Sequence, residues 1–141
     1  MKVQGWASTS DLDHYRHVVV PSAFAASVTE KGTKGPKGIK LLHAHDTRRV
    51  LGRITKLEPR NRGLWIEADI DEGISYAKDV ALSIKAQGGL SFSVGFLLVS
   101  ADIEETTDGR EYLRILEGDL LEVSVVTEPG NSEAVITQYE G

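Results

Sequence analysis

The chain has 141 residues, the size of one ordinary domain, with no cysteine and a net charge of -5. The lack of cysteine excludes disulfides, thiolate nucleophiles and cysteine-based zinc sites, and fits a reducing compartment. Both charge signs are spread along the chain without a basic stripe, which disfavours nucleic-acid binding. No apolar run approaches the ~20 residues of a membrane span, and no signal peptide is visible. We therefore expect a soluble cytoplasmic protein without a membrane partner.

The first half of the chain combines strand patterns with one short helix. Strands are predicted at residues 2–8, 18–20, 39–45 and 50–57. A helix is expected over residues 21–28, because Pro21 suits the first turn of a helix. Polar residues 9–17 and the glycine-rich stretch 32–38 are expected to be loops.

The second half has longer strand patterns and one amphipathic helix. Strands are predicted at residues 63–70, 90–100, 116–127 and 134–139. Apolar residues at helical spacing predict a helix over residues 74–87, and Gly88 follows where a C-terminal glycine is common. Asp108-Gly109 predicts a hairpin turn.

These elements define the expected fold class. Seven or eight strands with two helices do not alternate regularly, so a doubly wound parallel sheet is disfavoured. We expect one domain over residues 1–141 that is mainly β with helices (α+β). Its strands would form a mostly antiparallel barrel or sandwich, and no domain boundary is visible.

The segment LLHAHD, residues 41–46, places two histidines two positions apart. In a strand, His43 and His45 would share one face. This pattern fits a zinc pincer, a catalytic base or two surface histidines. Zinc is disfavoured, because the only other histidines, His14 and His17, lie in a separate polar segment and no H-E-x-x-H motif exists.

Two later strands carry polar residues on one face. Ser91, Ser93 and Gly95 alternate with Phe92, Val94 and Phe96, while Leu120, Glu122 and Ser124 alternate with Leu121, Val123 and Val125. With the apolar faces in the core, Ser93, His45 and Glu122 would meet on the outer wall as nucleophile, base and orienting acid. Gly95 would let a substrate backbone approach. A non-catalytic interpretation is also possible, in which Ser93 is a small strand residue, His45 a surface histidine and Glu122 a solvated glutamate.

An ordered set of short motifs covers nearly the whole chain. They are GWAS at 5–8, VPSAF at 20–24, LLHAHD at 41–46 with Gly52 after it, RGL at 62–64, LSFSVGF at 90–96 and EVSVVTEPGN at 122–131. In these motifs the chain resembles the prohead (procapsid maturation) serine proteases of tailed bacteriophages, which are related in fold to herpesvirus assembly proteases. It departs from them at Ser22, Arg16 and His17, where the family tends to have glycine, glycine and aspartate.

The resemblance implies a serine endopeptidase with a β-barrel core and no cofactor or metal. It assigns His45 to the family's His-Asp pattern and Ser93 to its Ser-x-Gly-Phe pattern. Glu122 is the natural third member, although the herpesvirus relatives use a second histidine there. An oxyanion hole is required, and backbone amides in the 127–131 turn are candidates for it.

The implied substrates are the scaffolding protein or the scaffolding-like part of the major capsid protein, and eventually the protease itself. The implied location is the assembling procapsid in the host cytoplasm. Because the related viral proteases dimerise, the resemblance is compatible with a homo-oligomer. The alternative is a catalytically inactive barrel of the same fold that acts as a capsid-assembly or scaffold-binding module.

Overall fold

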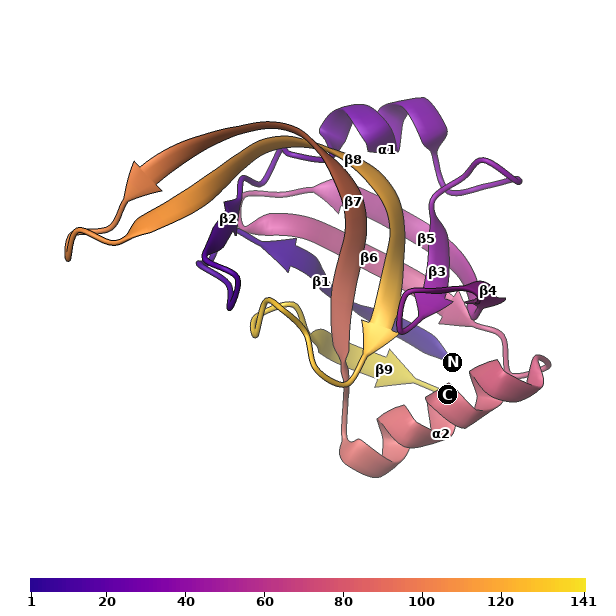
Figure 1. Ribbon diagram of the computed structural model, residues 1–141. Helices are drawn as coiled ribbons and strands as arrows, with labels where there is room; N and C mark the ends of the chain where they lie inside the picture. Colours follow the sequence, from indigo (N-terminus) through magenta and orange to yellow (C-terminus); the bar gives the residue numbers. More distant parts are fainter.

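A computed structural model describes all residues, 1–141, and contains nine strands and two helices (Figure 1). One sheet has the strand order β5-β6-β1-β9. Its strands are β1 (Lys2–Thr9), β5 (Gly52–Pro59), β6 (Gly63–Ile70) and β9 (Ile136–Glu140), and all its pairings are antiparallel. Alternate residues of β6, from Leu64 to Ile70, are buried, as expected for a sheet that covers a core with one face.

The second sheet is built on two long strands, β7 (Ser91–Glu105) and β8 (Glu111–Val126), which pair antiparallel over their length. On the other edge of β8 lie two short parallel strands, β2 (His17–Val19) and β3 (Lys40–His43). Strand β4 (Asp46–Val50) pairs antiparallel with β3. The protein is therefore mostly antiparallel, with two parallel pairings that both involve β8.

Helix α1 (Ala25–Lys31) fills the gap that β2 and β3 leave along the edge of β8. The Ser27 hydroxyl accepts the Leu120 N–H at 3.0 Å and donates to Gly118 O at 3.2 Å. The Lys31 ammonium donates to Leu120 O at 2.9 Å. These contacts satisfy backbone groups that would otherwise be unpaired in a buried edge.

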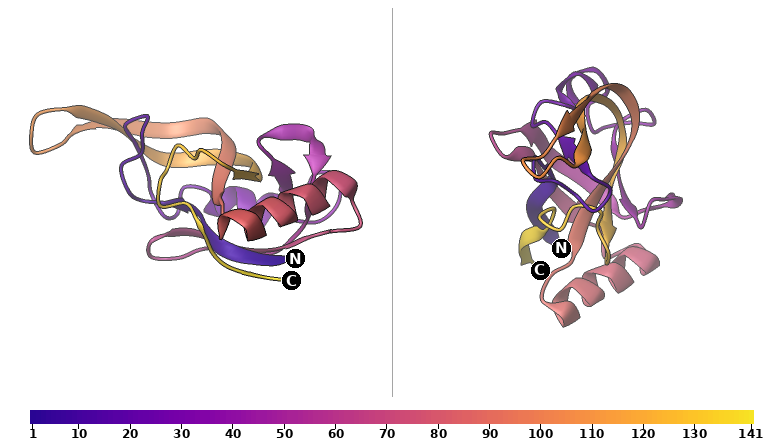
Figure 2. Two further views of the ribbon diagram at one scale, coloured as in Figure 1. Left: turned by 90° about the horizontal axis from the view of Figure 1, so that it is seen from below. Right: turned by 60° about the vertical axis from the view of Figure 1, so that its left-hand side comes forward.

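The inner faces of the two sheets form one hydrophobic core, and α2 (Ser75–Gln87) closes one end of it (Figure 2). The buried face of α2 consists of the residues predicted from helical spacing, among them Ala77, Val80 and Ile84. Gly88 ends the helix in the left-handed conformation, with φ 79°. Neither helix is long and apolar enough to span a membrane.

The expectation of a mainly β protein with two helices is confirmed, but a closed barrel is not found. The strand ladders form two open sheets of four and five strands. Only isolated backbone hydrogen bonds run between the sheets, such as Leu51 N–H to Leu41 O at 2.9 Å and Phe92 N–H to Ala134 O at 2.8 Å. Leu51 also separates β4 from β5, where a single strand was expected over residues 50–57.

Two other element boundaries differ from the prediction. The first helix begins at Ala25, because residues 21–24 form successive tight turns, with Ala23 N–H bonded to Val20 O and Ala25 N–H to Ser22 O. Strands β7 and β8 extend to Glu105 and from Glu111, well beyond the ranges 90–100 and 116–127. Pro21 thus suggested too early a start for the helix, and the polar residues of the hairpin suggested strands that were too short.

A β-bulge interrupts the predicted alternation in β8. Gly95 lies opposite Glu122 but Phe96 lies opposite Leu120, so Leu121 is an extra residue in the ladder. As a result Leu120 is fully buried and Leu121 is 45% exposed. The prediction that Leu121 shares the core face with Val123 is therefore wrong.

Candidate active site

His45 lies in the tight turn between β3 and β4, not in a strand as predicted. Ala44 and His45 both have positive φ, 50° and 61°, as in a two-residue type I′ hairpin turn. Such turns favour glycine or asparagine, because positive φ crowds a β-carbon against the backbone. Since His45 is part of this turn and not of a strand, the argument that His43 and His45 point from one strand face does not hold.

The turn brings the His45 imidazole next to the Ser93 hydroxyl and the Glu122 carboxylate, the two groups predicted from later strands. Nε2 lies 3.1 Å from Ser93 Oγ, and Nδ1 is hydrogen-bonded to Glu122 Oε1. Ser93 and Glu122 come from β7 and β8, which lie side by side. With Nδ1–H donated to the carboxylate, Nε2 is free to accept the serine proton.

Glu122 is buried, with a side chain 10% exposed, while the His45 side chain is 45% exposed. The solvated outward glutamate considered from the sequence is therefore excluded. Gly95 lies directly across from it, and a β-carbon at Gly95 would come within 2.3 Å of Glu122 Oε1. The glycine makes room for this carboxylate, a role that the sequence did not suggest.

Ser124 connects Glu122 to the turn and was not singled out from the sequence. Its hydroxyl donates to Glu122 Oε2 at 2.6 Å and accepts the His45 backbone N–H at 2.9 Å. The side chain is completely buried. The sequence placed Ser124 on the same strand face as Glu122, but it did not indicate that Ser124 supports the β3–β4 turn.

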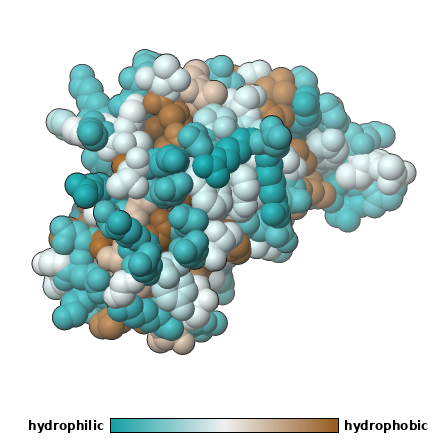
Figure 3. Space-filling model, turned by 180° about the vertical axis from the view of Figure 1, so that it is seen from behind, coloured by the Kyte–Doolittle hydropathy of each residue, from teal (hydrophilic) through white to brown (hydrophobic).

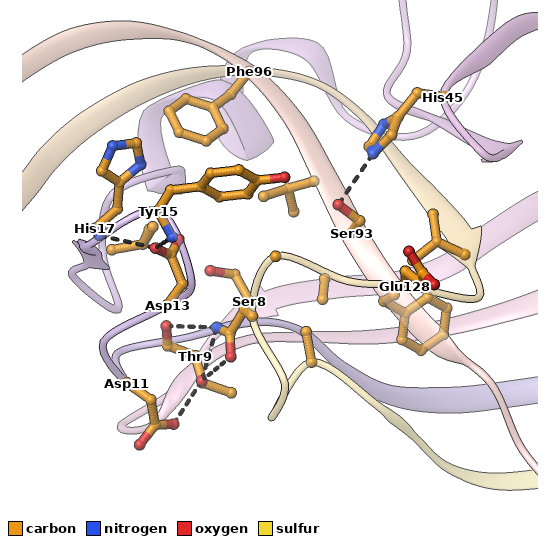
Figure 4. A pocket seen from close by; sticks show the side chains of 18 of the residues that line it. Ser8, Thr9, Asp11, Asp13, Tyr15, His17, His45, Ser93, Phe96 and Glu128 are labelled. Carbon is orange, nitrogen blue, oxygen red and sulfur yellow. Dashed lines mark hydrogen bonds between the residues drawn. The ribbon is translucent and has the colours of Figure 1, made fainter.

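A cavity of about 440 Å³ opens beside Ser93 and His45 (Figure 4). Phe92, Val94 and Phe96 give it an apolar side. Asp11, Asp13 and Tyr15 of the loop between β1 and β2, together with His17 at the start of β2, form the opposite wall. The cavity is large enough for several side chains of an extended peptide. Sequence reasoning assigned this polar loop no role in the site.

The 127–131 turn forms a further wall of the cavity. Asn131 fixes it to β1, because its amide donates to Thr9 O at 3.2 Å and to Thr9 Oγ1 at 3.0 Å. The Tyr15 ring packs so closely on Gly130 that a β-carbon there would lie 2.5 Å away. The backbone N–H groups of Glu128, Gly130 and Asn131 form no hydrogen bond within the protein.

The remaining residues of LLHAHD lie outside this arrangement. His43 lines a separate cavity with Arg49 and Tyr76. Asp46 faces Arg48, whose guanidinium and backbone N–H both donate to its carboxylate and lower the pKa of Asp46. No group of three or more histidine, aspartate and glutamate side chains is arranged to hold a metal ion.

Comparisons with known proteins agree on one family. A family model described as "Caudovirus prohead serine protease" matches residues 3–140. The chain is also 33% identical over 136 residues to a "Prohead protease" of Escherichia phage T5. That alignment covers 95% of this chain and 60% of the relative, so the chain spans less than two thirds of the relative's length.

Proposed function

Because the chain belongs to the caudovirus prohead serine protease family, we propose that residues 1–141 form a protease domain with Ser93, His45 and Glu122 as its catalytic residues. The single observation that carries this proposal is the continuous chain of hydrogen bonds from Ser93 Oγ through the His45 ring to Glu122. The β3–β4 turn supplies His45, and strands β7 and β8 supply Ser93 and Glu122, so the base lies between the nucleophile and the orienting acid as acyl transfer requires.

In the proposed reaction, Ser93 Oγ attacks the carbonyl carbon of the scissile peptide bond while His45 Nε2 takes the serine proton. Glu122 holds the Nδ1 tautomer and stabilises the imidazolium that forms. His45 then gives the proton to the leaving amine as the C–N bond breaks, which leaves an acyl-enzyme. Water, deprotonated by His45, hydrolyses the ester and restores the Ser93 hydroxyl.

The tetrahedral intermediate needs donors for its oxyanion, because negative charge develops there in a site with little water. We assign this role to backbone N–H groups of the 127–131 turn. Glu128, Gly130 and Asn131 line the cavity beside Ser93, and their N–H groups are unused within the protein. The anchoring of Asn131 to Thr9 would keep these donors in place before the substrate binds.

The proposed substrates are the scaffolding protein or the scaffolding-like part of the major capsid protein, cleaved inside the procapsid in the infected cell. Self-cleavage and a homo-oligomeric state are part of the same proposal. An inactive assembly module would not require an ordered Ser–His–Glu contact. The 3.1 Å distance between His45 Nε2 and Ser93 Oγ therefore favours the enzyme.

The test is cleavage of the co-expressed capsid precursor of the same phage, followed by mass spectrometry of the products. Ser93→Ala should abolish cleavage while the protein stays folded, and Ser91→Ala on the same strand face is the matched control. Glu122→Gln should lose less, because the Ser–His pair remains. Full cleavage by folded Ser93→Ala protein would refute the proposed nucleophile.

A further inference from the structure

The distal part of the β7–β8 ribbon, residues 97–121, which we call the arm, curves away from the core to a free tip at the β7–β8 turn (Figures 1 and 2). Five of the eight large hydrophobic side chains that the protein exposes lie on it. They are Leu97, Leu98, Val99, Ile103 and Leu121, and each is between 45% and 71% exposed. Figure 3 shows hydrophobic surface where the arm joins the body and hydrophilic surface towards its tip. Clustered apolar side chains of this kind indicate a binding surface.

The backbone of the arm also has a free edge. β7 forms a strand ladder only with β8, and its other edge is bonded only at its start, where Phe92 N–H donates to Ala134 O and Leu90 O accepts the Ile136 N–H. Beyond this point no strand is hydrogen-bonded to this edge of β7 up to Glu105. A long unpaired edge can take up an extended peptide as an additional strand.

The arm carries the whole net charge of the protein. Residues 97–121 contain seven acidic and two basic residues, a net charge of -5. The chain has 21 acidic and 16 basic residues, so the other 116 residues hold 14 of each sign and are neutral. Four acids of the arm are exposed at a strand position and form no ion pair: Asp102, Glu105, Glu111 and Glu117. A second copy of the arm would bring the same charge, so a basic partner is favoured.

The arm is continuous with the candidate active site. Ser93 and Leu97 lie on the same face of β7 by strand alternation, about 13 Å apart along the strand. On β8, the exposed Leu121 is adjacent to Glu122. A chain bound along this ribbon would therefore be led directly to the Ser93 hydroxyl.

We propose that the arm docks a segment of the protein substrate that carries both apolar and basic side chains and adds to the free edge of β7. This inference rests on the proposed protease function and names what that site recognises. At about 3.3 Å per residue, the distance from Ser93 to Leu97 and to Glu105 places the docked segment about four to twelve residues from the cleaved bond. Selection of the substrate thus depends on sequence well outside the cavity.

The test compares two substrates of one enzyme: the intact capsid precursor and a hexapeptide that spans its cleavage site. The variant Leu97→Ser/Val99→Ser/Ile103→Ser removes apolar surface from exposed positions. Its matched control is Leu82→Ser, which is 50% exposed on α2 away from the arm. We expect kcat/KM for the precursor to fall at least about tenfold, because apolar side chains that anchor it are lost. We expect kcat/KM for the hexapeptide to stay unchanged. Equal loss on both substrates, or no loss on either, would overturn the proposal.

A charge variant, Asp102→Asn/Glu105→Gln/Glu117→Gln, tests the basic character of the partner. It should weaken precursor cleavage and reduce its dependence on salt, again without affecting the hexapeptide. Improved precursor cleavage in this variant would contradict a basic segment.

Binding of the precursor to Ser93→Ala protein separates this inference from the proposed function. Arm substitutions introduced in that background should lower the affinity whether or not the wild-type protein cleaves. Arm-dependent binding without cleavage would refute the proposed function and retain the docking surface. Arm variants that bind the precursor normally but change the sedimentation of the protein would show that the arm pairs with a second copy instead.

Discussion

Two hairpins of the same sheet hold their turns in opposite ways. The β3–β4 turn puts Ala44 and His45 at positive φ without a glycine, and it relies on β8 for support. Ala44 N–H donates to Val125 O at 3.0 Å, and His45 N–H donates to Ser124 Oγ. The β7–β8 turn places Gly109 at φ 80° and is closed by its own residues, with Thr106 N–H bonded to Arg110 O at 2.8 Å.

The contrast shows where conformational strain is stored. A non-glycine residue at positive φ costs about 1–2 kcal/mol, and such residues persist where surrounding contacts over-determine them. Here the surrounding contacts come from the strand that also carries Glu122. The strained turn thus aligns the His45 ring, whereas the relaxed glycine turn only ends a ribbon.

The largest expected difference between the hairpins is in activity. His45→Ala should lower kcat/KM on the hexapeptide by about 10⁴-fold or more, because the serine loses its base. Gly109→Ala should leave this activity unchanged and cost about 1 kcal/mol of unfolding free energy, since alanine disfavours φ 80°. Hexapeptide kinetics and urea unfolding measure the two effects. Comparable activity loss in both variants would remove the functional distinction between the turns.

Gly95→Ala should give the next largest loss. The added β-carbon would displace the Glu122 carboxylate from His45, so we expect kcat to fall about 100-fold or more. Ser91→Ala, on the same strand face, is again the control. Wild-type kcat in a Gly95→Ala protein would mean that Glu122 is not needed where it lies.

Ser124→Ala tests whether β8 positions the histidine through the turn. Loss of the hydroxyl leaves the part-buried His45 N–H without its partner and removes the donor to the buried Glu122 carboxylate, which should lower kcat about tenfold and the unfolding free energy by about 1–3 kcal/mol. KM should change little, because Ser124 is buried beneath the site. If Ser124 acts through Glu122, the double variant with Glu122→Gln should lose no more kcat than Glu122→Gln alone. Additive losses in kcat would assign the two residues independent roles.

The smallest expected effect concerns Asp46, which follows His45 in the tight hairpin. Hydrogen bonds from Arg48 lower its folded-state pKa below the ordinary 3.8, so its stabilising contribution is present above that pH and is lost as pH falls through the folded pKa. Asp46→Asn should therefore be slightly less stable than wild type at pH 7, with the difference closing in acid. Thermal unfolding across pH measures this, and Asp102→Asn on the arm is the control. A difference that persists unchanged at low pH would exclude the carboxylate as its cause.

Sequence patterns predicted elements whose structure depends on local chemistry. The Asp108-Gly109 turn, the apolar face of α2 and the alternation along β6 follow from backbone preference and side-chain period. The Ser93, His45 and Glu122 assignment came mainly from motif resemblance. The structure brings these side chains together, although the predicted reason for the direction of His45 was wrong.

The sequence by itself determined a mainly β fold with two helices, and it indicated the serine, histidine and glutamate that we propose as catalytic residues. Only the tertiary structure decided that His45 leaves a tight turn, that Leu121 is bulged and that Gly95 accommodates Glu122. The reason is physical. Strand period and turn composition act between near neighbours, whereas positive φ without glycine and a buried carboxylate are stable only when distant strands supply their hydrogen bonds.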